Sequence, residues 1–460
     1  MSVSTLPGCR RKSARKPNVV LILTDDQGTL DAHCYGAADL FTPTMDGLAE
    51  TGVRFTQAYS HTVCCPARAL LMTGRHPQRC GVNSWVQGNT KDEKKGRNMF
   101  RSEITLAEVL KGSGYRTGLF GKWHLGAHVD HGPMEQGFDE FLGLRDGFID
   151  NYNHCQLHGN GYHDLYEGTR EIFREGEYFP DIITGEAVRF VRENRDRPFL
   201  LYLAFNIPHY PEQSDNKFDG RYADLPEPRR SYAKMISTTD DRMGRVVKEI
   251  EKLGLRDDTI FIMLSDNGHS PEDYKIRGDN HVSGLPKGAN YGANGGGGFT
   301  GKWRGAKGSF FEGGIRLPAI ISYPKRLPEG AVRDQAVIAA DWFPTVLDLC
   351  EIPLPDVELD GRSLLPIMRS SDAPSPHEVM YWQWQEHWAV REGDWKLIVN
   401  GRDSTDPWQD VPMRREKIAP VFLGNLAEEN PEFVNHAEER PEIVARLTAL
   451  HEKWVKEVMP

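Results

Sequence analysis

Short, mostly apolar segments alternate with helical patterns over the first three quarters of the chain. Segments typical of strands buried on both faces of a sheet lie at 18–24, 53–59, 115–120, 198–206, 259–264 and 317–323. Helical patterns lie between or after them at 42–50, 105–112, 181–194, 229–253 and 341–349. This alternation predicts an α/β fold, with a large mixed, mostly parallel sheet flanked by helices.

The last part of the chain has a different pattern. Residues 366–376 are rich in Ser, Pro and Asp and are interpreted as a linker. Short strand patterns at 379–384, 387–391 and 395–399, and an amphipathic helix at 441–458, follow it. They predict a smaller C-terminal α+β subdomain made of an antiparallel sheet plus a helix. We therefore expect an N-terminal tail (1–17), a large α/β domain (18–368) and a C-terminal subdomain (377–460).

Polar side chains follow two of the predicted buried strands directly. Asp25 and Asp26 come after the strand at 18–24, and Asp266 and Asn267 come after the strand at 259–264. Ligands of open α/β sheets gather at the carboxyl ends of the strands, so these residues are candidates for one site. Asp25 and Asp26 repel each other unless a cation lies between them. The alternative is two solvated turns, in which Asp and Gly are common.

A second candidate site begins at Cys64. Pro66 suits the first turn of a helix, and Gly74 is a plausible helix end, so Cys64 is expected at a helix N-terminus. Arg68 lies four residues on and can share a face with Cys64. Free N–H groups and a guanidinium would then hold a tetrahedral anion beside a nucleophile. The alternative is a buried, inert cysteine.

Composition excludes several functional classes. The 460 residues carry a net charge of −10, and no Lys/Arg run is long or interleaved with aromatic residues, so nucleic acid is not an expected partner. No apolar run reaches the length of a membrane span. The odd cysteine count argues against a disulfide scaffold, and the absence of a CxxC pair argues against a cysteine zinc site.

The N-terminus leaves the compartment open. Residues 1–9 lack the apolar core of a signal peptide, so the chain as written would be cytoplasmic. If the start is truncated, a periplasmic or secreted protein is equally compatible with the sequence.

The segment from Cys64 to Gly74 resembles the signature of the type I sulfatases, members of the alkaline phosphatase superfamily. That signature reads Cys-x-Pro-x-Arg, followed by a hydrophobic residue, Thr and Gly. The resemblance implies that Cys64 is oxidised to the aldehyde formylglycine by the formylglycine-generating enzyme, whereas Cys65 occupies a variable position.

Further matches cover most of the chain. Gly121-Lys122-Trp123-His124 matches a family motif, and if this segment stays extended, Lys122 and His124 point to one side. Lys307-Gly308 followed by Glu312-Gly313-Gly314 matches another. The resemblance implies these catalytic residues: Cys64, Arg68, Lys122, His124, His209 and Lys307. It implies these metal ligands: Asp25, Asp26, Cys64, Asp266 and Asn267. Such an oxygen-rich set suits Ca²⁺ first, with Mg²⁺ as the alternative, and does not suit zinc.

The resemblance also implies a reaction. A hydrated formylglycine carries two hydroxyl groups: one attacks sulfur and displaces the alcohol, and the other then expels sulfate and restores the aldehyde. An unmodified cysteine could not complete this cycle. His124 is expected as the base at the diol, with His209 or Lys307 protonating the leaving oxygen.

Two alternatives remain at this point. A phosphonate or phosphate ester hydrolase of the same superfamily shares the motif, and a non-catalytic binding protein could share the fold. The expected substrate is a carbohydrate sulfate, because the loop at 270–301, taken as the rim of the site, is polar. Its polar residues include Asp273, Tyr274, Arg277, Asp279, Asn280, His281, Asn290 and Asn294.

Overall fold

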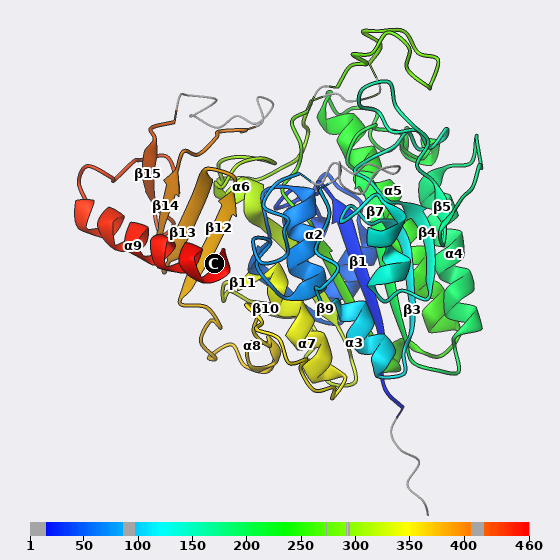
Figure 1. The fold of residues 1–460 in the computed structure, drawn as a ribbon, viewed down its shortest axis with the longest axis horizontal. Helices are drawn as coiled ribbons and strands as arrows, with labels where there is room; N and C mark the ends of the chain where they lie inside the picture. The colour runs from blue at the N-terminus through cyan, green and yellow to red at the C-terminus, as the bar shows by residue number, and fades with distance from the viewer. Residues whose placement is uncertain are drawn as a thin grey trace, which may run out of the picture.

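The computed structural model describes residues 15–85, 97–272, 274–290, 292, 295–405 and 418–459. Within these ranges the chain forms two sheets, a large one of eleven strands and a small one of four. Figure 1 shows the small sheet and the C-terminal helix at one side of the large sheet and its helices. The predicted fold class is therefore confirmed.

The large sheet is parallel at its centre. Its strands are β1 (Asn18–Asp25), β2 (Val53–Tyr59), β3 (Arg116–Lys122), β4 (Glu140–Leu144), β5 (Tyr166–Glu167), β6 (Arg170–Glu171), β7 (Phe199–Pro208), β8 (Thr259–Ser265), β9 (Arg316–Ser322), β10 (Ala331–Arg333) and β11 (Val337–Ile338). They follow the order β10-β2-β9-β8-β1-β7-β3-β4-β5-β6, with β11 beside β2. The central neighbours β8, β1, β7 and β3 pair in parallel, whereas β9 runs antiparallel to β8 and β2.

The apolar run of β1 explains its central place. All of its residues are buried. Val19 and Leu21 pack into one apolar cluster and Val20 and Ile22 into another, because successive side chains of a strand point to opposite faces. A strand of this kind needs a helical layer on each side.

Helices supply both layers. One face is covered by α2 (Cys64–Thr73), α3 (Leu106–Gly112) and α7 (Trp342–Leu349), and the other by α1 (Pro43–Glu50), α4 (Phe179–Glu193) and α5 (Arg229–Lys252). The short helices α6 (Glu312–Ile315) and α8 (Leu365–Arg369) complete this part of the chain. The helix α3 begins with a capping box, in which Thr105 and Glu108 bond reciprocally. No described helix has the length and apolar character needed to cross a membrane.

The small sheet is antiparallel throughout. Its order is β12 (Val379–Trp384), β13 (His387–Glu392), β14 (Trp395–Val399) and β15 (Val421–Asn425), and α9 (Pro441–Val458) packs on it. The first three strands and the helix were predicted, whereas β15 was not. Its five residues include Gly424 and Asn425, which have low strand propensity, so local pattern alone did not mark it.

A buried ionic network joins the small sheet to the large one. Lys396 Nζ on β14 lies 2.8 Å from Glu312 Oε1 and 2.5 Å from Glu432 Oε1. Tyr59 at the end of β2 donates a hydrogen bond of 2.6 Å to Glu312 Oε2. Because Glu312 begins α6, this network ties the segment in front of β9 to the second sheet.

Candidate active site

The ends of the central strands bring the predicted residues together. Asp25 is the last residue of β1, Lys122 the last of β3, and Asp266 follows β8 directly. His209 follows the last residue of β7. Since these four strands are parallel neighbours, their carboxyl ends meet at one edge of the sheet. Lys307 reaches the same edge because it precedes the antiparallel strand β9.

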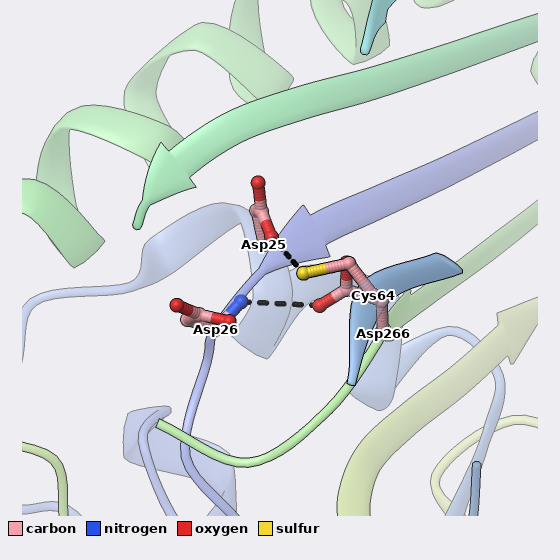
Figure 2. A group of neighbouring side chains, drawn as sticks. All are labelled: Asp25, Asp26, Cys64 and Asp266. Atoms are coloured by element: carbon pink, nitrogen blue, oxygen red, sulfur yellow. Dashed lines mark hydrogen bonds between the residues drawn. The ribbon is translucent and has the colours of Figure 1, made fainter. Parts of the chain in front are cut away.

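Helix α2 delivers the cysteine to this edge. It begins at Cys64, after the extended residue Val63, and ends at Gly74, whose φ of 68° is left-handed. The Cys64 thiol lies 3.6 Å from Asp25 Oδ1, and Figure 2 shows it surrounded by Asp25, Asp26 and Asp266. Burial raises the pKa of this thiol well above its ordinary value. The sequence prediction of a cysteine at a helix N-terminus therefore agrees with the structure.

Three cations face the three carboxylates. Lys122 Nζ lies 2.6 Å from Asp25 Oδ2, and Lys307 Nζ lies 2.9 Å from Asp26 Oδ2. The Arg68 guanidinium donates one hydrogen bond to Asp266 Oδ2, at 2.9 Å, and another to the Lys122 carbonyl. The formal charges of these six groups therefore cancel.

The carboxylates differ in their proton affinity. Burial raises the pKa of Asp25, but the ammonium of Lys122 and the guanidinium of Arg68 outweigh it, so the pKa is lowered. Burial raises the pKa of Asp26 to about 7, and the carboxylates of Asp25 and Asp266 add to this rise. Burial and Asp25 also raise the pKa of Asp266. Additional positive charge is therefore favourable at this cluster.

The cluster fits a divalent metal ion. One possible ligand atom from each of Asp25, Asp26, Cys64 and Asp266 lies within 4.8 Å of the others. Asn267 donates through Nδ2 to Asp26 Oδ1 at 2.6 Å, while its buried Oδ1 has no hydrogen-bond partner among the described residues. A buried oxygen without a donor is costly, and a cation would satisfy it.

His124 reaches the site by a route that the sequence did not indicate. The condition that Lys122 to His124 stays extended does not hold, because His124 has a left-handed φ of 58°. Its N–H donates to the Arg145 carbonyl at 3.1 Å, which holds the turn in place. Its Nε2 lies 3.2 Å from the Cys65 sulfur and 3.9 Å from Asp146 Oδ1.

His209 lines the same cavity as Cys64 and His124. Its Nδ1 bonds the Tyr210 carbonyl at 2.7 Å, and since a carbonyl can only accept, Nδ1 carries the hydrogen. Its Nε2 lies 3.6 Å from Asp26 Oδ2, and its ring stacks on Phe148 with 5.0 Å between the ring centres. Burial and neighbouring lysines lower the pKa of both His124 and His209, so both rings are neutral near pH 7.

A cavity of about 440 Å³ opens above Cys64. Besides the two histidines and Lys307, its described lining consists mainly of aromatic and polar side chains: Trp85, Asp146, Phe148, Gln156, His158, Tyr162, Tyr210 and Glu272. The expectation that the loop at 270–301 forms the rim is wrong for most of that loop, since only Glu272 of its described residues lines the cavity. Asp273 and Asn294, named in that expectation, lie outside the described residues.

Sequence reasoning did not single out several polar residues of this cavity, among them Asp146, Tyr162 and Glu272. Asp146 accepts a hydrogen bond from the Tyr162 hydroxyl, and Glu272 lies 3.2 Å from Lys307 Nζ. Asp146 and Tyr162 sit in irregular segments with no periodicity that could have marked them. Glu272 follows Asp266 by six residues, so its closeness to the strand edge was the one available signal.

Comparisons with known proteins agree with this geometry. A sequence model of the sulfatase family matches residues 17–352, and a model described as N-sulphoglucosamine sulphohydrolase, C-terminal, matches residues 303–413. Arylsulfatase A of Homo sapiens is 32% identical, with 86% of this chain and 78% of that protein covered. Steryl-sulfatase of Mus musculus is 30% identical, with 80% of this chain and 67% of that protein covered.

A solved structure extends the likeness to the whole fold. The crystal structure of Ps i-CgsB in complex with k-i-k-neocarrahexaose is 27% identical, with a TM-score of 0.77, and covers 96% of this chain and 93% of that chain. Together with the family match over most of the sequence, these likenesses show that the chain belongs to the sulfatases, which are sulfuric ester hydrolases.

Proposed function

We propose that this sulfatase hydrolyses a carbohydrate sulfate, using formylglycine at position 64 and one divalent metal ion, Ca²⁺ before Mg²⁺. The observation that carries the proposal is the cavity that opens directly onto Cys64 and is lined mainly by aromatic and polar side chains. Its described lining contains no Leu, Ile, Val or Met. A steroid needs an apolar slot, whereas a sugar offers C–H faces to aromatic rings and hydroxyl groups to polar atoms.

The charge of the site supports an anionic substrate. Arg68, Lys122 and Lys307 are balanced by Asp25, Asp26 and Asp266, so a bound divalent ion would leave the cluster with net positive charge. The ion would be held by these carboxylates, Asn267 and residue 64, and would supply Lewis-acid activation of an oxygen. Arg68, Lys122 and Lys307 would stabilise the charge that develops on the sulfuryl oxygens.

The two histidines fit the proton transfers of this reaction. His124 and residue 64 line the same cavity, and His124 Nε2 lies 3.2 Å from the sulfur of the neighbouring Cys65, so His124 would accept a proton from the formylglycine diol. His209 keeps its hydrogen on Nδ1, and its Nε2 lies beside Asp26, close to Lys307. His209 or Lys307 would then protonate the leaving oxygen.

Mass spectrometry of the peptide that carries residue 64 tests the nucleophile. We expect formylglycine at position 64 and an unmodified Cys65, and Cys64→Ala should abolish turnover. Full activity of Cys64→Ala would refute the proposal. The control is Cys350→Ala, which removes another buried thiol, remote from this edge of the sheet.

A substrate panel tests the class of ester. We expect higher kcat/KM for sulfated mono- and oligosaccharides than for aryl and steroid sulfates. Matched phosphate and phosphonate esters, assayed at saturating metal, should be poorer substrates. A preference for the steroid would refute the carbohydrate assignment, and a preference for phosphorus esters would refute the sulfatase reaction itself.

A further inference from the structure

Glu272 occupies a distinct position in the cavity. The Lys307 ammonium bridges Asp26 Oδ2, at 2.9 Å, and Glu272 Oε2, at 3.2 Å. The side chain of Asp26 is 1% exposed, whereas that of Glu272 is 43% exposed. The Lys307 ammonium therefore lies between the buried acidic cluster and Glu272, which is the more exposed of its two carboxylate partners.

The contacts of Glu272 hold one carboxylate oxygen and leave the other available. Oε2 accepts hydrogen bonds from Lys307 and from the Ser270 hydroxyl, at 2.8 Å. Within the described part of the chain, no hydrogen bond uses Oε1. Although burial raises the pKa of Glu272, Lys307 and His209 lower it to about 2, so the group is a carboxylate at neutral pH. A fixed, ionised acceptor thus lines the cavity.

The depth of Glu272 decides which part of the substrate it meets. If the sulfate group lies at the buried cluster, as in the proposed function, the alcohol part lies toward the opening, level with Glu272. A carboxylate there accepts hydrogen bonds but donates none. A hydroxyl or ammonium group can satisfy it, whereas a second sulfate would be repelled.

We propose that Glu272 selects the alcohol part of the substrate. Its carboxylate accepts a hydrogen bond from a hydroxyl or ammonium group on the carbon next to the sulfated carbon, and it rejects esters with a second sulfate at that position. The inference rests on the proposed function for the placement of the ester. It narrows the substrate class to monosulfated units with a neighbouring hydrogen-bond donor.

Equilibrium binding to the metal-loaded full chain with Cys64→Ala tests this without turnover. The probes are galactose and glucose monosulfates, each beside an analogue with a second sulfate on the neighbouring carbon and a deoxy analogue without the neighbouring hydroxyl. We expect the monosulfate to bind at least about tenfold more tightly than either analogue, because a hydrogen bond to a charged group is lost or replaced by repulsion. When Glu272→Gln is added, we expect the dissociation constants of the monosulfate and of the disulfate analogue to differ by no more than about threefold. The reason is that the glutamine amide can donate a hydrogen bond to the second sulfate.

The matched control is Asp279→Asn in the same loop. Asp279 is 78% exposed and pairs with Lys287 at 3.3 Å, and it does not line the cavity. Loss of discrimination with Glu272→Gln alone would support the inference. The inference would be overturned if the affinity ratio of monosulfate to analogue were the same with and without Glu272→Gln, or if Glu272→Gln and Asp279→Asn lowered this ratio equally. It would also be overturned if no ester bound.

The two proposals fail differently in these experiments. If formylglycine is found and sugar sulfates are hydrolysed, but the affinity ratios do not change in Glu272→Gln, only the inference about Glu272 is overturned. A Glu272-dependent binding ratio without formylglycine or turnover would overturn only the proposed reaction. The melting temperature of each variant reports whether it is folded.

Discussion

Cys65 lies next to the proposed nucleophile, at a position that the family signature leaves variable, and its contacts in the fold suggest a role for it. Cys65 is fully buried, and its sulfur lies 3.2 Å from His124 Nε2. His124 itself is in a left-handed conformation that most side chains avoid. The Cys65 thiol is therefore placed to hold the imidazole ring of His124 in one orientation, while the left-handed turn fixes the position of the His124 backbone.

Substitutions at Cys65 should separate this positioning role from simple packing. Cys65→Ser keeps a hydrogen-bonding group, and we expect it to retain kcat within about threefold, whereas Cys65→Ala should lose about tenfold, the worth of roughly one hydrogen bond. Steady-state kinetics with a sulfate ester measures both. Cys350→Ala serves as the control, because it removes a buried thiol of similar size far from His124 and should leave kcat unchanged. Equal kcat values for Cys65→Ala and Cys65→Ser would contradict the positioning role.

At the scale of elements, the meeting of the central strands could be predicted from the sequence. The apolar run that ends at Asp25 and the one that ends before Asp266 are each long enough to be strands but too short for helices. Parallel strands with both faces buried place their carboxyl ends at one edge, so Asp25-Asp26 and Asp266-Asn267 were expected at the same edge. Pro66 and Gly74 likewise marked helix α2 through their backbone preferences.

The cavity walls could not be predicted in this way. The left-handed turn at His124 depends on a bond to the Arg145 carbonyl, a contact between segments that no local pattern encodes. Asp146 and Tyr162 approach each other through irregular chain, and the loop after β8 contributes Glu272 instead of its longer polar stretch. Strand β15 was not predicted because its local strand propensity is weak. It forms because it pairs with β14, which is a contact between segments.

The proposed metal site lies at the ends of β1 and β8, and we expect the pH dependence of its affinity to follow from Asp26. In the metal-free protein the pKa of Asp26 is about 7, raised first by burial, against an ordinary value of 3.8. The folded state therefore holds a proton that the unfolded state releases between about pH 4 and 7, so metal-free stability falls as pH rises through that window. A cation replaces this proton, and its affinity should rise as pH approaches and passes 7.

We expect the melting temperature with Ca²⁺ or Mg²⁺ to exceed that with a chelator, by a margin larger at pH 8 than at pH 6. A concentration one hundred times the dissociation constant should contribute about 2.7 kcal/mol of stability. Differential scanning fluorimetry at the two pH values measures the margin, with Asp25→Asn as the variant that should reduce it. An equal margin at both values would contradict the role assigned to Asp26.

At the scale of the whole molecule, the second sheet contributes to the site indirectly. Lys396 of β14 pairs with both Glu312 and Glu432, and all three side chains are fully buried. Glu432 also accepts the N–H of Glu312 at 2.8 Å. Because Glu312 lies five residues after Lys307, the small sheet fixes one end of the segment that carries this active-site cation.

Removing the ammonium of Lys396 should therefore affect both stability and turnover. In Lys396→Met two carboxylates stay buried without their main cation, which should lower the free energy of unfolding by about 3–5 kcal/mol. Urea denaturation measures this loss, and Lys453→Met, which removes an exposed lysine of α9, is the matched control. Adding Glu432→Gln to Lys396→Met should recover part of the loss, because one uncompensated charge disappears.

We also expect kcat of Lys396→Met to fall at temperatures where the variant is folded, since the chain from Lys307 to Glu312 loses its anchor. A denaturation midpoint and a kcat that both match the control would show that the two sheets are joined without help from this network.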